Sequence, residues 1–268
     1  MGKRIVVKVG TSTLTHRSGG LNFRNMDHLA RVLADIRGQG HEVVLVSSGA
    51  IGVGAGKLGM RQKPTELSLK QAAAAVGQLE LMHIYDKFFS EYGCIVAQIL
   101  LARSDVDDPI SRANLERTFE SLLHLGAIPI VNENDSVCFE EIESEHKVFG
   151  DNDTLSAVVA TLLNADLLVL MSDIDGVFDR DPHKDPDARL IPVINELTED
   201  VWKLAGGAGS DFGTGGMITK FQAAKLATES GCDMVITNGA KPDNLYFLAE
   251  GGRIGTLFRA QNRKRSDT

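Results

Sequence analysis

Short apolar runs alternate along the chain with longer segments in which apolar residues recur at helical spacing. The runs have the length and the β-branched content of buried strands; they are residues 5–9, 43–46, 95–101, 128–131, 167–170 and 234–236. The intervening pattern predicts helices over residues 26–36, 67–89, 114–123 and 217–230, and another after Asp153. Strands that alternate with helices predict an α/β fold, a three-layer αβα sandwich with a central, mainly parallel sheet.

We expect one domain to contain the whole chain, residues 1–268. The chain has 268 residues, of which 43% are hydrophobic, and this is enough for a sizeable core. No linker, internal repeat or low-complexity block divides it. Residues 179–192 are rich in Asp and Pro, which predicts a surface loop.

Polar or glycine-rich clusters directly follow four of the predicted strands. They are residues 10–12, 47–49, 132–135 and 172–173. In open parallel sheets, ligands bind at the carboxyl ends of the strands. We therefore expect these clusters to meet at one edge of the sheet.

The first cluster, from Lys8 to Ser12, has the composition of an anion-binding turn. Gly10 lets the backbone approach a ligand closely, and the N–H groups of such a turn can bind phosphate. Lys8 adds a positive charge for the same anion. The alternative is a solvated lysine at the end of a strand. The turn is not a P-loop, because G-x-x-x-x-G-K-[ST] does not occur here.

The second cluster runs from Ser47 to Gly52 and opens into a helix. Its small residues expose backbone N–H groups that suit a carboxylate or a phosphate. A tight turn with a serine N-cap is the alternative.

The third cluster combines residues 132–135 with residues 150–153, and it is dense in Asn, Asp and Glu. Its carboxylates can bind an ammonium group, orient lysines or help to hold Mg²⁺ through water. The alternative is that Asp153 only caps the helix that follows it. Capping and a role in catalysis are compatible.

The fourth cluster is a glycine-rich loop that enters a helix, residues 213–220. Such a loop presents N–H groups and the positive end of the helix dipole to an anion. Lys220 is predicted in the first turn, where a lysine is unfavourable unless an anion binds nearby. A flexible glycine hinge is the alternative.

Composition narrows the classes of function. The formal net charge of −8 argues against a duplex nucleic-acid binder. The three cysteines are far apart, which suits a reducing compartment better than a disulfide framework. The seven histidines show no metal-binding spacing. Because no leader and no apolar run of roughly 20 residues is present, we expect a cytoplasmic protein without a membrane segment.

Five motifs, residues 8–12, 47–51, 132–135, 150–153 and 213–220, occur in an order that resembles the amino acid kinase superfamily, and most closely its branch that phosphorylates glutamate. The resemblance covers residues 3–260 and includes supporting blocks at residues 71–78, 98–101 and 255–258. Kinases of acetylglutamate, aspartate, carbamate and UMP share the fold but have different versions of several blocks.

The resemblance implies a reaction. ATP transfers its γ-phosphoryl group to the side-chain carboxylate of L-glutamate and gives γ-glutamyl phosphate, the first step of proline biosynthesis. Lys8 and Lys220 then resemble the catalytic lysines that neutralise the phosphoryl oxygens. Asp153 resembles the catalytic aspartate that holds both lysines in place.

The resemblance also implies binding residues. The positions similar to glutamate-binding residues are Ser48, Gly49, Asp135 and Asn152. The positions similar to ATP-binding residues are Lys8, Gly10, Ser172, Asp173, Thr214, Gly215, Gly216, Met217, Ile218, Thr219 and Lys220. Mg²⁺ is expected with ATP as the co-substrate, although the sequence indicates no direct protein ligand for it. Residues 1–163 would bind the amino acid and residues 164–260 the nucleotide.

Partners follow from the same resemblance. We expect a homo-oligomer, proline as a feedback inhibitor, and transfer of the labile product to glutamyl phosphate reductase. Two alternatives stay open: another acyl-phosphate kinase of this fold, for acetylglutamate or aspartate, and a nucleotide-binding regulator without turnover. The presence of Lys8, Asp153 and Lys220 together argues against the regulator.

Two features depart from the family pattern. Many relatives carry an added C-terminal RNA-binding-like domain of the PUA type, whereas this sequence stops about where the kinase domain is expected to end. Residues 137–149 are acidic and longer than usual. They predict a surface loop that tolerates insertion, or else a lid that alters glutamate binding or proline inhibition.

Overall fold

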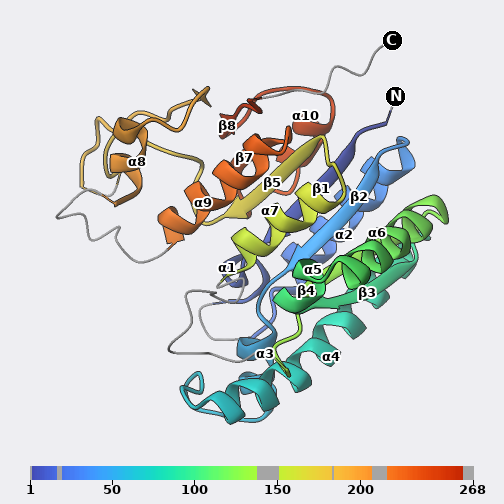
Figure 1. The fold of residues 1–268 in the computed structure, drawn as a ribbon. Coiled ribbons are helices and arrows are strands. Elements are labelled where there is room, and N and C mark those ends of the chain that lie inside the picture. Colours follow the sequence, from blue (N-terminus) through green and yellow to red (C-terminus); the bar gives the residue numbers. More distant parts are fainter. Residues whose placement is uncertain (1, 17–19, 138–150, 183, 207–215, 262–268) are drawn as a thin grey trace.

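A computed structural model describes residues 2–16, 20–137, 151–182, 184–206 and 216–261 of the chain (Figure 1). Its strands form one sheet. They are β1 (Arg4–Val9), β2 (Glu42–Ser47), β3 (Val96–Leu101), β4 (Ile128–Glu133), β5 (Leu167–Ser172), β6 (Val193–Ile194), β7 (Asp233–Asn238) and β8 (Thr256–Phe258).

The sheet has the order β3-β4-β2-β1-β5-β7-β8-β6. All of its paired strands run parallel except β7 and β8, which are antiparallel. β1 lies at the centre, where Lys8 is opposite Val46 of β2 and Leu170 of β5. The prediction of a mainly parallel sheet is therefore confirmed.

Helices cover both faces of the sheet (Figure 1). On one face lie α2 (Phe23–Gly38), α3 (Ala50–Lys57), α4 (Leu67–Glu91) and α10 (Asn244–Ala249). On the other face lie α6 (Pro109–His124), α7 (Asn152–Leu162), α8 (Glu199–Gly206) and α9 (Gly216–Glu229). Two short helices, α1 (Thr11–Leu14) and α5 (Arg103–Asp107), follow β1 and β3. The three-layer αβα architecture is confirmed.

Alternation along β1 separates the two halves of the core. Ile5, Val7 and Val9 pack under α2, α4 and α10, whereas Val6 packs under α7 and α9. Both sets are almost fully buried. A strand that is covered on both faces needs apolar residues at every position, and this explains the continuous apolar runs of the sequence.

Glycines bring α3 and α4 into close contact. A methyl group on Gly77 would overlap the carbonyl oxygen of Ala50, and one on Gly54 would overlap that of Ala73. No side chain separates the two backbones at these points, so any larger residue there would push the helices apart. The N-cap of α3 is Gly49, whose φ of 102° is a conformation that glycine adopts without strain.

Some elements differ from the prediction. The helix expected over residues 114–123 begins earlier, at Pro109, because the Asp108 side chain accepts a hydrogen bond from the Ser111 N–H and proline suits the first helical position. The sequence pattern did not indicate α8, α10, β6 or β8. β6 and β8 have only 2 and 3 residues, too few to show a period.

The expected loop over residues 179–192 is confirmed for its described residues, and a single antiparallel bridge joins Phe178 to Leu190. Of the long acidic segment 137–149, only Val137 lies within the described residues. In the part of the chain that the structure describes, no helix has the length and apolar character needed to cross a bilayer.

Candidate active site

Lys8 is a buried cation at the carboxyl end of the central strand. Its side chain is 11% exposed, so it is not the solvated strand-end lysine of the alternative interpretation. The β1 alternation places Lys8 on the same face as Val6, beneath α7 and α9. Its ammonium Nζ lies 2.6 Å from Oδ1 of Asp153.

Asp151, and not Asp153, caps α7. Its Oδ1 accepts a hydrogen bond of 2.8 Å from the Thr154 N–H. The interpretation of Asp153 as the capping residue is therefore wrong. Since Asp151 satisfies the helix end, the carboxylate of Asp153 in the first turn is left for other partners. That carboxylate is 5% exposed.

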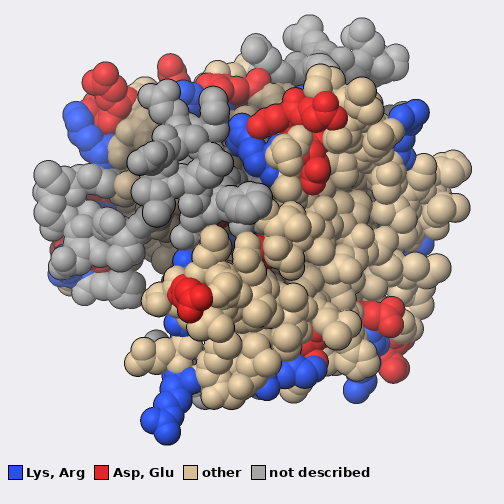
Figure 2. All heavy atoms as spheres, turned by 60° about the horizontal axis from the view of Figure 1, so that its bottom comes forward, with Lys and Arg blue, Asp and Glu red and all other residues tan. Residues whose placement is uncertain are grey.

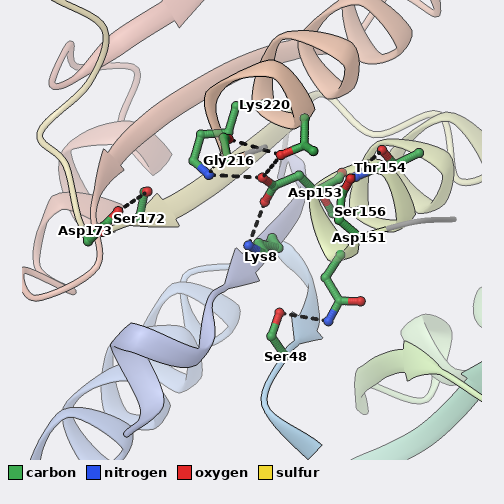
Figure 3. Close-up of polar contacts among 12 residues, drawn as sticks. Lys8, Ser48, Asp151, Asp153, Thr154, Ser156, Ser172, Asp173, Gly216 and Lys220 are labelled. Atoms are coloured by element: carbon green, nitrogen blue, oxygen red, sulfur yellow. Dashed lines mark hydrogen bonds and ion pairs between the residues drawn. The ribbon is translucent and has the colours of Figure 1, made fainter. Parts of the chain in front are cut away.

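Lys220 reaches the same carboxylate from α9. Its Nζ lies 3.0 Å from Oδ2 of Asp153 and donates a hydrogen bond of 3.1 Å to the Gly216 carbonyl oxygen. α9 begins at Gly216, so Lys220 lies just beyond the first turn and its side chain points back toward the helix start. Thr219 adds a hydrogen bond of 3.1 Å to Oδ2. Figure 3 shows Lys8 and Lys220 on two sides of Asp153.

The electrostatics of this group favour an anion. Burial alone would raise the pKa of Asp153, but the charges and hydrogen bonds of Lys8 and Lys220 outweigh it, and the pKa of Asp153 is lowered. The carboxylate therefore stays ionised, and two ammonium groups around one carboxylate leave one net positive charge. We call Lys8, Asp153 and Lys220 the charge triad.

Gly10 lies beside the triad. Nζ of Lys8 is 3.6 Å from the position that a Cβ on Gly10 would occupy. A side chain at this position would therefore lie against the ammonium group and partly cover it. Glycine at this position therefore leaves that side of the ammonium group uncovered. The binding of phosphate by this turn stays a prediction.

Next to the triad, a pocket of about 350 Å³ opens at the carboxyl edge of the sheet. The predicted glutamate-binding residues Ser48, Gly49, Asp135 and Asn152 all line it. The amide nitrogen of Asn152 lies 2.8 Å from the Ser48 hydroxyl and 3.1 Å from Oδ1 of Asn132. The structure thus brings together residues at the carboxyl ends of β2 and β4 and at the start of α7. We call this cavity the edge pocket.

The acidic side chains of the edge pocket are partly shielded from water. Burial raises the pKa of Asp135, and it also raises the pKa of Asp151 despite the hydrogen bond from Thr154. A raised pKa means that each carboxylate lacks sufficient compensation for its charge. A cationic group bound in the pocket would supply it.

The predicted nucleotide residues fall into two groups in the structure. Met217 lines a mainly apolar pocket of about 190 Å³ together with residues 174 and 176–182. Ser172 and Asp173, which share a hydrogen bond of 3.0 Å, line a separate polar hollow on the α2 side. Thr214 and Gly215 lie outside the described residues. Gly216 contacts Lys220, and Ile218 is 37% exposed.

Some residues of the edge pocket were not among the predicted site residues. Asn132 lines the pocket and donates a hydrogen bond of 2.9 Å to Gln78, which lies outside the lining; both belong to motifs that the sequence analysis had noted. Lys63 and Lys70 also line the pocket. No local pattern marks these two lysines, since lysines in and beside loops are usually solvated.

Comparison with known proteins agrees with this geometry. Residues 3–238 match the model of the amino acid kinase family. The chain is 53% identical to glutamate 5-kinase of Listeria monocytogenes serovar 1/2a, over 97% of this chain and 94% of that protein. It is 52% identical to glutamate 5-kinase of Clostridium perfringens, over 97% of this chain and 96% of that protein.

Solved structures resemble the fold. Carbamate kinase from Giardia lamblia bound to AMP-PNP matches with a TM-score of 0.69 and 19% identity, over 97% of this chain and 99% of that one. UMP kinase from Bacillus anthracis matches with a TM-score of 0.66 and 19% identity, over 97% of each chain. The chain belongs to the amino acid kinase family and, within it, to the glutamate 5-kinases.

Proposed function

We infer that this protein transfers the γ-phosphoryl group of ATP to the side-chain carboxylate of L-glutamate and produces γ-glutamyl phosphate and ADP. The observation that carries this inference is the charge triad beside the edge pocket. Lys8 and Lys220 are held by one buried carboxylate at 2.6 and 3.0 Å. Full-length similarity to glutamate 5-kinases selects glutamate over acetylglutamate and aspartate as the acceptor.

The chemistry needs charge neutralisation more than proton transfer. An oxygen of the glutamate side-chain carboxylate attacks the γ-phosphorus, and the bond from that phosphorus to the β,γ-bridging oxygen breaks. The nucleophile is already ionised, so no general base is required. Catalysis then consists of positioning and of stabilising negative charge on the transferring and leaving oxygens. Lys8 and Lys220 supply the positive charge, and Asp153 holds them in position.

The edge pocket is the proposed glutamate site. Ser48, Gly49 and Asn152 line it, and Asn152 directly precedes Asp153 of the triad in the chain. The reacting carboxylate would bind on this side of the pocket. Asp135 would face the ammonium group of the substrate, since burial has raised its pKa and a cation restores its charge.

The apolar pocket at Met217 is the proposed site of the nucleotide base. It lies at the start of α9, so a nucleotide bound there can direct its phosphates toward Lys220, Gly10 and Lys8. All residues that line the edge pocket lie between positions 11 and 152 of the chain, and all that line the apolar pocket lie between positions 174 and 217. This separation supports a functional division near residue 163 within one continuous domain.

Mg²⁺ is proposed to enter with ATP. Within the described residues, no group of three or more His, Cys, Asp or Glu side chains is placed to hold a metal ion. The Asp153 carboxylate is already engaged by two lysines. The residues therefore fit an ion that is held mainly by phosphate oxygens and water, where it would neutralise further phosphate charge.

The remaining expectations about partners stay predictions: proline as a feedback inhibitor, transfer of the product to glutamyl phosphate reductase, cytoplasmic location and self-association. One observation supports self-association. Figure 2 brings the α3–α4 side forward, and charged side chains are sparse over the centre of this face. On and beside these helices, Leu58, Leu69 and Leu79 are 49%, 44% and 72% exposed.

A hydroxylamine trap tests the proposed function. The enzyme is incubated with ATP, Mg²⁺ and hydroxylamine, which converts an acyl phosphate into a hydroxamate that is detected as its coloured iron(III) complex. L-Glutamate is compared with N-acetyl-L-glutamate and L-aspartate. We expect hydroxamate with L-glutamate alone. Turnover with another acid would overturn the substrate, and ATP binding without turnover of any acid would favour a nucleotide-binding regulator.

A further inference from the structure

The edge pocket contains charges of both signs from different parts of the fold. Asp135, after β4, and Asp151, at the start of α7, contribute carboxylates. Lys63, in the loop between α3 and α4, contributes an ammonium group. An amino acid whose side chain reacts at the triad must leave its own ammonium and α-carboxylate in the rest of the pocket. The pocket thus has a candidate partner for each.

Lys63 lies against the first turn of α3. Its Cε is 3.5 Å and its Nζ 3.9 Å from the position that a Cβ on Gly52 would occupy. No side chain caps the start of α3, so its first N–H groups have no partner within the helix. The ammonium and these N–H groups make this wall of the pocket electropositive.

The Lys63 ammonium is available for a ligand. Within the described part of the chain, no hydrogen bond or ion pair holds it. Lys70, the other lysine of the pocket, is partly buried and interacts with other protein groups. Lys8 and Lys220 are committed to Asp153. Among the lysines near the pocket, Lys63 is therefore the one whose charge the protein leaves uncompensated.

We propose that Lys63 binds the α-carboxylate of the amino-acid substrate and makes the enzyme specific for acceptors that carry this group. The proposal rests on the proposed function, because it assumes that the side-chain carboxylate reacts at the charge triad. With the ammonium at Asp135 and Asp151 and the α-carboxylate at Lys63, the substrate is fixed at three points. Its side-chain carboxylate is then directed toward Lys8.

The test compares two acceptors that differ only at the α-carboxylate. L-Isoglutamine keeps the ammonium and the side-chain carboxylate but has a neutral carboxamide in place of the α-carboxylate. We measure kcat and KM of both acceptors for wild type, Lys63→Ala and Lys63→Arg. The matched control is Lys57→Ala, because Lys57 is a nearby lysine that pairs with Glu80 and does not line the pocket.

We expect Lys63→Ala to raise the KM for L-glutamate at least about tenfold, the usual effect of losing a charged hydrogen bond. The kcat, the KM for ATP and the kinetics with L-isoglutamine should stay near the wild-type values. Lys63→Arg should restore most of the glutamate affinity, and Lys57→Ala should change none of these constants. Because Lys63 is exposed, its replacement should leave the melting temperature unchanged.

Three outcomes contradict the proposal. A Lys63→Ala variant with wild-type KM for glutamate overturns it, while the reaction itself stands. Equal weakening of L-glutamate and L-isoglutamine would show that Lys63 shapes the loop and does not read the α-carboxylate. A similar KM increase in Lys57→Ala would indicate general electrostatic attraction. Absence of glutamate turnover in the wild type would instead overturn the proposed function.

Discussion

Replacing Lys220 by alanine separates catalysis from stability at the charge triad. In the wild type, the Lys220 side chain is 12% exposed and its ammonium group lies 3.0 Å from Asp153. Its removal leaves Lys8 as the ammonium partner of Asp153, 2.6 Å away. The net charge of the triad then falls from positive to neutral, so the site loses the charge that attracts and stabilises the phosphoryl oxygens.

The magnitude follows from the distance and the burial. An ammonium group about 4 Å from a developing negative charge contributes about 4 kcal/mol at an effective dielectric constant of about 20. Loss of one preorganised catalytic donor costs about 3–4 kcal/mol in other enzymes, or roughly 10²–10³ in kcat. We therefore expect kcat of Lys220→Ala to fall by about 10²–10³.

The fold should survive this change. A buried charge that loses its last partner costs about 3–5 kcal/mol, but Asp153 keeps Lys8 and the Thr219 hydrogen bond. The loss of stability should therefore stay below that range.

The assay is hydroxamate formation at saturating glutamate and ATP, together with a thermal melt. Lys225→Ala is the matched control on α9, because its side chain is 59% exposed and pairs only weakly with Glu229 at 4.0 Å. A folded Lys220→Ala variant with wild-type kcat would refute the assignment of Lys220 to catalysis. An equal kcat loss in Lys225→Ala would attribute the effect to net charge.

Three further predictions concern stability and the edge pocket. Asp153→Asn leaves two buried ammonium groups without their carboxylate and should lower the free energy of unfolding by roughly 3–5 kcal/mol. Urea denaturation measures this change, and an unchanged midpoint would contradict the inference that Asp153 compensates two buried charges. Burial raises the pKa of Asp135, so as pH falls this carboxylate is neutralised at a higher pH than an ordinary aspartate with a pKa of about 3.9. The KM for glutamate should therefore rise in that pH range, and Asp135→Asn should abolish this pH dependence. A flat wild-type profile would count against Asp135 as the partner of the substrate ammonium group. Gly77→Ala places a methyl group against the Ala50 carbonyl oxygen, so it should lower the free energy of unfolding by about 1–3 kcal/mol and raise the KM for glutamate. In the control Gly38→Ala the new methyl group meets no neighbour, so both quantities should stay at their wild-type values.

The sequence by itself determined the fold class and indicated most residues of the candidate site. The apolar runs and the helical periodicity indicate a parallel sheet, because strands and helices differ in a period that is visible locally. The positions of Lys8 and Gly10 at a strand end, and of Lys220 after a glycine-rich loop, indicate anion binding from local chemistry alone. The short β6 and β8 escaped this reasoning, because their pairing is with distant strands.

Tertiary structure decided which groups meet. The strand order β2-β1-β5-β7 places α7 and α9 side by side on one face, and this alone lets Lys8 and Lys220 share Asp153. Only the structure shows that Asp151 caps α7. Several acidic residues lie near this helix start in the sequence, and the backbone geometry determines which of them accepts the hydrogen bond of the helix end. The position of Lys63 over Gly52 was not predictable, because a loop lysine acquires its environment only when α3, α4 and the sheet edge have packed.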